Sequence, residues 1–506
     1  MSGIKRNRER VMVIVLLLVL GPLGQARAEP PRQQATTWLG RARLSFMRRH
    51  PGLASHFIGG SRRAHKGRDK RWLTRGTAVL LAASILAPTV GTAGGFTGGA
   101  VNAPTEVSKT LYPIKPYREV APKVAEKMIT WMNRVDDRAL AWAAKNHPGE
   151  NWAHSVPLLL YALSPYVVGS TEASVRENLM KPLGADTIMT PAEFIHGVQT
   201  VVRHIDSTPG VKQALAVFLK SSPYPAYRKA VTEGLNAEVA DLGQTSVAEA
   251  TRAVNRFIET STTVKDGGTV VLPGIKDLVG PRLVRESDIL SVAALAAHGK
   301  YREMFSPTRT KQEPFHTANG TGKGMQMRGT RSVYFAREGD VHSAALVAKN
   351  GLVDWIVVPS ADLSTPARVA AFEKVLTTRP ADFQRRMADI WLPRTSLSAH
   401  GDPVALMKGL GIDPAKIDLV NIDGDPGLKI KRGVMQTALR RNEAGIAGQS
   451  GVAIGGSRGV GPVPEVKVRT DVGHITGIST PDGIPLISAV VNDIANDPGP
   501  ARADGF

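Results

Sequence analysis

The chain contains no cysteine among its 506 residues, and this restricts how its fold can be stabilised. Disulfide bonds, thiolate metal sites and a cysteine nucleophile are excluded, whatever the compartment in which the protein works. The composition, 42% hydrophobic and 21% charged, is that of an ordinary folded protein. We therefore expect a globular protein whose stability comes from a large hydrophobic core.

The formal net charge of +20 is concentrated at the N-terminal end. Residues 1–80 contain 17 lysines and arginines but only three acidic residues, so they supply most of the excess. The rest of the chain is only weakly basic and has no particular preference for polyanions. We therefore predict no nucleic-acid partner, and the basic end is instead typical of an export or membrane-surface signal.

Residues 1–28 have the features of a secretory signal peptide. Basic residues between Lys5 and Arg10 precede the apolar run Val11–Leu20, and the small-x-small sequence Ala26–Ala28 follows as a cleavage pattern. We therefore predict an exported protein, secreted or extracellular.

A second basic and apolar unit lies within the N-terminal extension formed by residues 29–110. Residues 62–75 are densely basic and residues 77–101 carry no charge, so they can act as a second signal or as a membrane anchor. Their most apolar part is shorter than the roughly 20 residues that span a membrane. Two explanations stay open: translation starts downstream, for instance at Met47, or the first segment is cleaved and the second anchors the chain.

The remaining chain, residues 111–498 followed by a tail at 499–506, has the pattern of one α+β domain. Apolar residues at three- and four-residue spacing predict helices over Val124–Val135, Leu158–Val167, Pro191–His204 and Glu249–Glu259. Short β-rich runs predict strands over Thr269–Leu272, Trp355–Val358, Asp389–Leu392 and Leu486–Val491. Because helices come first and strands concentrate later, an α+β fold is favoured over alternating βαβ units.

Several short motifs follow one another along this domain. They are Asn146–Asn151 with Ser155, Gly299–Pro307, Glu313–His316, Met325–Met327, Ile356–Pro359, Leu392–Arg394, Pro464–Lys467 and Val490–Asn492. In order and approximate spacing they resemble the serpin family of serine protease inhibitors, over about residues 120–493. The resemblance identifies a divergent serpin, exported and of bacterial type. It implies a large central β-sheet with smaller sheets, several helices and an exposed reactive-centre loop near the C-terminus, at about residues 444–464.

The resemblance also places the hinge of that loop. The hinge residues are Glu443, Ala444, Gly445, Ile446, Ala447, Gly448 and Ser450. In the family, protease attack forms an acyl ester at the exposed bond, and the cut loop then inserts as a new strand in the large sheet. An inserted strand alternates faces, so if Ile446 is the first residue to face inward, Gly448 and Ser450 follow it. No charged residue or proline lies between Ala444 and Ser457, so nothing in this stretch forbids insertion.

The reactive bond is placed by the family's spacing counted from both ends of the loop. Counting from the hinge points to Gly459, and counting back from Pro464–Lys467 points to Val460. Arg458 is the only charged side chain in this window and suits a trypsin-like protease. We therefore predict cleavage between Arg458 and Gly459, with a neighbouring bond as the alternative. A flexible surface loop that any protease can cut is the simpler interpretation of the same sequence.

The chain departs from the family pattern at positions that matter for inhibition. Inhibitory serpins usually have a charged residue in place of Ala444, Thr or Ser in place of Ile446, and fewer glycines, which weaken a strand. The switch region that controls sheet opening is assigned to Asn151, Ser155, Ala293, Met435 and Tyr301. Asn151 and Ser155 match the family, whereas Leu158, Ala293 and Met435 stand where Ser, Asn and His are typical, and Tyr301 replaces a tryptophan. Slow insertion would let the acyl ester hydrolyse.

The sequence therefore predicts a serine protease inhibitor that acts as a suicide substrate, without a cofactor, a metal or a catalytic residue of its own. It is expected to be a monomer whose partner is a serine protease. A non-inhibitory serpin that serves as a binding or envelope protein is the alternative. A distant alternative is a hydrolase using Ser457, because residues 455–459 match Gly-x-Ser-x-Gly. That motif needs a following helix, which the prolines at 462 and 464 disfavour.

Overall fold

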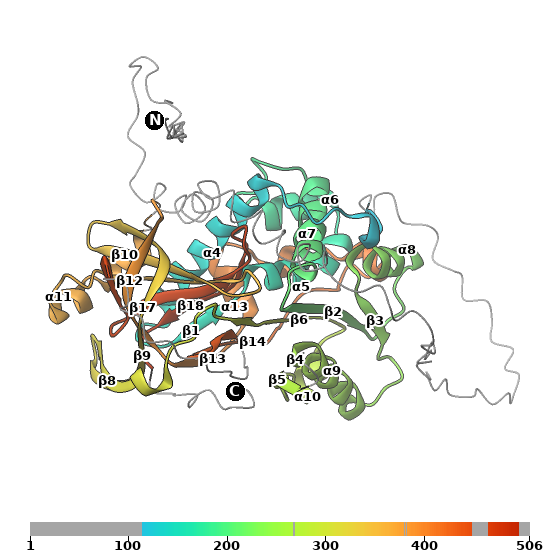
Figure 1. Cartoon of the computed structure of the whole chain (residues 1–506). Coiled ribbons are helices and arrows are strands. Elements are labelled where there is room, and N and C mark those ends of the chain that lie inside the picture. The colour runs from blue at the N-terminus through green and yellow to red at the C-terminus, as the bar shows by residue number, and fades with distance from the viewer. Residues whose placement is uncertain (1–113, 267–268, 379, 381, 448–463, 495–506) are drawn as a thin grey trace, which may run out of the picture.

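The computed structural model describes residues 114–266, 269–378, 380, 382–447 and 464–494 (Figure 1). The predicted signal peptide, the whole N-terminal extension and the C-terminal tail lie outside these residues. So does the apolar stretch 77–101. Within the described ranges, no helix combines the length and the apolar character that crossing a membrane requires.

The helices are short apart from four, and those four are the ones that the sequence predicts. They are α4 (Glu126–Asn146), α5 (Val156–Val168), α7 (Pro191–Asp206) and α9 (Val247–Thr262). The shorter ones are α6 (Glu172–Val175), α8 (Pro225–Lys229), α10 (Pro281–Glu286), α11 (Thr365–Ala370), α12 (Phe372–Thr377), α13 (Pro403–Gly409) and α14 (Val420–Asp423). Both α7 and α9 start with a capping box, in which a hydroxyl and a glutamate three residues later satisfy each other's backbone N–H groups.

The largest sheet has nine strands. Its order is β1 (Trp152–His154), β18 (Pro485–Val491), β17 (His474–Ser479), β11 (Val353–Pro359), β10 (Val341–Val347), β9 (Gly320–Glu338), β12 (Gln384–Pro393) and β16 (Val466–Arg469), with β8 (Lys311–Thr317) paired to β9. All pairs are antiparallel except β12 with β16. Strands β11 and β18 are buried along their whole length, as expected for the continuous apolar runs that predicted them.

Two smaller sheets lie edge to edge and share one continuous stretch of chain. The first has the order β3 (Glu238–Asp241), β2 (Val211–Leu219), β6 (Ile289–Ala297). The second has the order β13 (Thr395–Gly401), β14 (Met435–Asn442), β15 (Gly445–Ala447), β7 (Gly299–Lys300). A two-stranded ribbon, β4 (Val264–Asp266) with β5 (Thr269–Leu272), forms a separate sheet, and its Val264 packs against Ala296 of β6. Strand β15 lies between β14 and β7, and β7 follows β6 after a single residue. Beyond the short strand β15, β6 and β14 therefore form the two walls of a gap.

Helices cover both faces of the first small sheet. Figure 1 shows α5 and α7 on one side of β2 and β6, and α9 and α10 on the other. The main core cluster joins α4, α5 and α7 to the inner faces of the sheets, with Trp131, Phe194 and Tyr227 among its largest fully buried side chains. A smaller cluster lies under α9. The gap between β6 and β14 is therefore enclosed by helices on both faces.

The predicted order of elements is only partly right. All four predicted strands are present, but β1, β2 and β3 precede most of the strand-rich half, so strands are not confined to the later part of the chain. Strands β2 and β6 are rich in alanine and leucine, and they are strands because they pair with each other along nine positions, between residues that are 70 to 86 apart in sequence. Long-range pairing thus overrides local helix propensity here.

Candidate functional site

The predicted hinge begins as a strand that lies between two others. Strand β15 is antiparallel to β14, with Arg441 opposite Ile446, and also antiparallel to β7, with Ile446 opposite Gly299. The chain therefore leaves the end of β14, turns at Glu443 and Ala444, and returns beside it. The hinge is already inserted at this end of the gap.

The close approach of β15 to β7 requires glycine at position 445. A Cβ atom built on Gly445 would lie 2.2 Å from the backbone oxygen of Gly299, closer than any real contact. Only a residue without a side chain fits there, so the seat of the hinge depends on this glycine.

The prediction that the exposed loop begins at about residue 444 is wrong. Ala444 and Ile446 are 0% and 1% exposed, and Ile446 belongs to the main core cluster. The physical reason is that β15 forms backbone hydrogen bonds on both edges while Ile446 covers apolar side chains beneath it. Ala444 and Ile446 therefore do not belong to an exposed loop.

The turn before β15 is anchored by a buried ion pair. The Oε1 atom of Glu443 accepts hydrogen bonds from Arg394 Nε at 2.8 Å and from Arg394 Nη2 at 2.5 Å. It also accepts one from the Thr310 hydroxyl at 2.7 Å. Both charged side chains are almost fully buried. The backbone oxygen of Glu443 accepts from the N–H of Phe305, so the turn is fixed by its side chain and by its main chain.

A second buried charged cluster lies directly beneath the hinge. Asp354 on β11 accepts the Tyr301 hydroxyl at 2.6 Å and Arg441 Nε at 2.9 Å on Oδ2, and Arg441 Nη2 at 2.5 Å on Oδ1. Arg441 Nη2 also donates to the Thr476 hydroxyl at 2.5 Å. Burial, reinforced by the Asp354 charge, raises the pKa of Tyr301, so its hydroxyl stays a donor. Burial alone would lower the pKa of Arg441, but Asp354 and the hydrogen bonds raise it overall.

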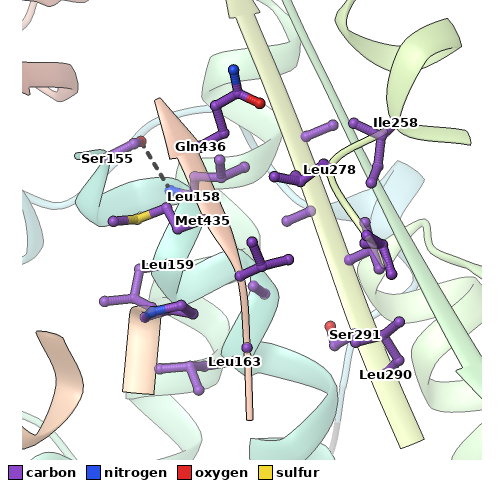
Figure 2. A pocket seen from close by; sticks show the side chains of 18 of the residues that line it. Ser155, Leu158, Leu159, Leu163, Ile258, Leu278, Leu290, Ser291, Met435 and Gln436 are labelled. Atoms are coloured by element: carbon purple, nitrogen blue, oxygen red, sulfur yellow. Dashed lines mark hydrogen bonds between the residues drawn. The ribbon is translucent and has the colours of Figure 1, made fainter. Parts of the chain in front are cut away.

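Below the hinge, the gap between β6 and β14 contains two adjoining cavities. The first, of about 130 Å³, is lined by Leu290–Leu295 of β6 and by residues 433–437 at the start of β14. The second, of about 250 Å³, continues along the same two strands as far as Ala297 and Arg440. Figure 2 shows β14 with Met435 and Gln436 on one side of the first cavity, β6 with Leu290 and Ser291 on the other, and α5 beside them. The lining is mostly apolar.

Of the predicted switch residues, the structure brings three together. Ser155, Ala293 and Met435 all line the first cavity, together with Leu158. Ser155 caps α5, its hydroxyl accepting the Leu158 N–H at 3.3 Å, the contact drawn in Figure 2. Asn151 is separate, since its side chain bonds the backbone of residues 492 and 493. Tyr301 lies at the hinge instead of at the cavity.

The remaining predicted site residues lie outside the described residues. They are Gly448 and Ser450 of the hinge, and Arg458, Gly459 and Val460 of the reactive bond. Ser457 of the distant hydrolase alternative is also outside. Among the residues that the structure describes, the first regular element after Ser457 is the strand β16, whereas a nucleophile elbow needs a helix.

Sequence reasoning missed the residues that hold the hinge. Arg394 lay in a recognised motif, but nothing in the sequence paired it with Glu443. Asp354 carried a weak signal, because it is the single charged residue in the apolar run Val353–Pro359. A lone carboxylate in a buried strand indicates a buried partner.

Comparison with known proteins gives a consistent result. The family model described as serpin (serine protease inhibitor) matches residues 138–471. A curated relative, Serpin B11 of Mus musculus, is 24% identical over 336 residues, which are 60% of this chain and 83% of that protein. Human Serpin B9 is 25% identical over 232 residues, 43% of this chain and 59% of that protein.

Solved structures show the same fold. Serpin48, described as a highly specific serpin of the insect Tenebrio molitor, matches with a TM-score of 0.59 at 18% identity over 73% of this chain and 98% of that one. Human thyroxine-binding globulin complexed with thyroxine matches with the same score and identity over 73% of this chain and 99% of that one. The family model covers well over half of the chain and the solved structures share its fold, so this chain belongs to the serpin family.

Proposed function

We propose that this protein is a serine protease inhibitor that acts as a suicide substrate. The family is one of protease inhibitors rather than enzymes. The observation that carries the mechanism is the position of β15, which is seated between β7 and β14 at one end of a gap that continues between β6 and β14. Residues 448–457 follow β15 directly and contain no charged side chain or proline before Arg458.

The inhibitory step follows from this arrangement. The protease serine attacks the carbonyl carbon of the reactive bond, the peptide C–N bond breaks, and the new amine leaves with the C-terminal part. The freed chain after β15 then extends down the gap, and its N–H and C=O groups pair with the edges of β6 and β14. Burial of every second side chain against the apolar lining drives the step. The acyl-linked protease is carried along and distorted.

Arg458–Gly459 is the proposed reactive bond, and a trypsin-like protease the proposed target. A trypsin-like pocket binds a basic side chain before the cut bond, and Arg458 is the only such side chain between residues 444 and 463. The basic and apolar N-terminal sequence supports an exported inhibitor, secreted or anchored by residues 77–101. We propose that it acts as a monomer, since one loop and one gap within the same chain suffice.

The experiment is to mix the purified protein with trypsin, subtilisin and elastase. A denaturing gel and mass spectrometry of the released C-terminal peptide identify the products. We expect a stable complex with trypsin whose mass is the sum of both proteins minus a peptide that starts at Gly459. Cleavage without a complex and without a gain in thermal stability would contradict inhibition and support a non-inhibitory binding role.

Two variants separate bond recognition from insertion. Ile446→Arg places a charge opposite Arg441 in the core, so we expect cleavage by trypsin without complex formation. Arg458→Ala keeps the hinge and should remove the reaction with trypsin only. Unchanged complex formation by Ile446→Arg would refute insertion.

A further inference from the structure

We propose that Asp354 is a positioning residue that holds the opening of the gap at the width of one extra strand. Its carboxylate lies on β11, in the nine-stranded sheet beneath the hinge, and it accepts hydrogen bonds from both sides of β15. Tyr301 donates from the β7 side and Arg441 from the β14 side. One buried acceptor therefore links the two strands that flank the inserted hinge.

The strand register explains why these side chains meet. Arg441 lies opposite Ile446, and the Tyr301 N–H donates to the Ala444 oxygen. Because side chains alternate between faces, residues 301, 441, 444 and 446 all lie on the inner face of the sheet. This face covers β11, so Asp354 is the acceptor beneath them.

The distance between β7 and β14 is fixed because the Asp354 side chain is short and both of its carboxylate oxygens accept hydrogen bonds. Neighbouring strands lie about 4.8 Å apart, so strands that flank a third are roughly 10 Å apart. Closing β7 onto β14, or separating them further, would pull Tyr301 or Arg441 away from the same carboxylate. Arg441 is further fixed by Thr476 on β17. Asp354 is the one carboxylate that pairs with Arg441 among the described residues, and a charged guanidinium that is 0% exposed cannot give it up at little cost.

Asp354 thus acts before any protease arrives. With the opening held at strand width and β15 in place, the cleaved loop can extend an existing strand and need not first separate β7 from β14. This consequence rests on the proposed inhibitory function. The seating of the hinge by Asp354 does not depend on it.

The absence of cysteine allows a direct test. In the variant Ile446→Cys, the introduced thiol is the only one in the chain, and the seated hinge buries it. Its rate of alkylation by iodoacetamide then measures how often the hinge leaves its seat. In this background, Tyr301→Phe removes one hydrogen bond to Asp354 and should raise the rate roughly fivefold. The paired change Asp354→Leu with Arg441→Met removes the whole link without leaving an unpaired charge, and should raise it well over tenfold.

A matched control is available elsewhere in the molecule. Arg368 and Asp471 form another buried ion pair, with side chains 3% and 1% exposed. In the described part of the chain their side chains bond each other and Arg469, and no hinge residue is among these partners. Replacing them by Met and Leu should leave the alkylation rate unchanged, even if the melting temperature falls. Circular dichroism on each variant checks that the fold is intact.

The proposal is overturned if Tyr301→Phe leaves the alkylation rate at the level of the parent. It is also overturned if the control pair raises the rate as much as the Asp354 and Arg441 pair does. If the latter pair fails to fold, Tyr301→Phe decides alone. Trypsin plays no part in the labelling, so a missing complex in the inhibition assay would refute the inhibitor and leave this result standing.

Discussion

The two ends of the gap are built from different chemistry. At the hinge, Glu443 and Arg441 are held by buried carboxylate, guanidinium and hydroxyl groups with defined partners. Beside the cavities, Leu158, Ala293 and Met435 present apolar side chains. Hydrogen bonds between charged groups are directional and fix positions, whereas apolar contacts restrict only volume. Polar hydrogen bonds therefore fix the position of β15 at the hinge end of the gap. The apolar part between β6 and β14 accepts any strand with small side chains.

The largest effect should come from breaking the polar end at Arg394. Arg394→Met removes the counter-charge of the buried Glu443 carboxylate, which keeps its hydrogen bond from the Thr310 hydroxyl. We expect a loss of about 3–5 kcal/mol in the free energy of unfolding, measured by urea denaturation.

A control for this prediction is an ion pair of similar geometry at the surface. Lys127 and Glu193 are 2.8 Å apart and about half exposed. Lys127→Met should cost less than about 1 kcal/mol. Equal losses at both sites would show that burial does not matter at the hinge.

Acidification should also act at the polar end, through His474. This ring is fully buried, its Nδ1–H donates to the Val472 oxygen, and its Nε2 has no partner among the described residues. Burial, with the nearby charges of Arg441 and Arg368 in support, lowers the pKa of His474 to about 3. Between pH 6.5 and 3 the unfolded chain therefore binds a proton that the folded chain refuses. Stability is full above pH 6.5 and falls as the pH drops, by about 2 kcal/mol between pH 7 and pH 5.

The variant His474→Asn isolates this contribution, because an amide can still donate to Val472 but does not titrate. Urea denaturation at pH 7 and pH 5 should show a smaller pH-dependent loss in the variant than in the parent. His342, whose pKa burial lowers to about 4, acts in the same direction and remains in both proteins. An identical pH dependence in the two proteins would contradict the assignment to His474.

The difference between the two ends also explains what the sequence could predict. Apolar periodicity located the four long helices and the continuous strands, because burial of a face leaves a local pattern. The family resemblance located the hinge and three residues of the apolar lining. The alanine-rich strand β6 has no such pattern, and its strand character comes from a partner far along the chain.

The polar end could not be derived because its bonds join distant residues. Asp354 and Arg441 are 87 residues apart, and no spacing rule connects them. The burial of Ala444 and Ile446 was missed for a related reason, since it depends on β7 and β14 flanking them at the same time. To predict which charged residues pair across two sheets, one must know how the strands are arranged in three dimensions. An apolar lining can be predicted from a run of apolar residues in the sequence.

A smaller effect should follow from filling the apolar end. Ala293→Leu places three more carbon atoms into the first cavity, so we expect the native protein to gain about 1 kcal/mol of stability. The larger side chain also narrows the gap between β6 and β14 and should slow insertion of the cleaved loop. More inhibitor molecules should therefore be cleaved for each complex formed with trypsin. Ala173→Leu, at an exposed position on α6, is the matched control and should change neither quantity. A stabilised variant with unchanged stoichiometry would show that the loop does not pass Ala293.

The smallest effect should come from replacing Ser155, a polar residue of the predicted switch region that lies at the apolar end of the gap. Its hydroxyl caps α5 through one bond of 3.3 Å to the Leu158 N–H, and it lines both cavities. Ser155→Ala should therefore cost about 1 kcal/mol in urea denaturation, like any lost cap, and should leave the stoichiometry with trypsin unchanged. Ser246→Ala, which removes the cap of α9, gives the reference for a cap away from the gap. If Ser155→Ala changes the stoichiometry and Ser246→Ala does not, a directional polar contact controls the passage too, and the contrast between the two ends fails at this residue.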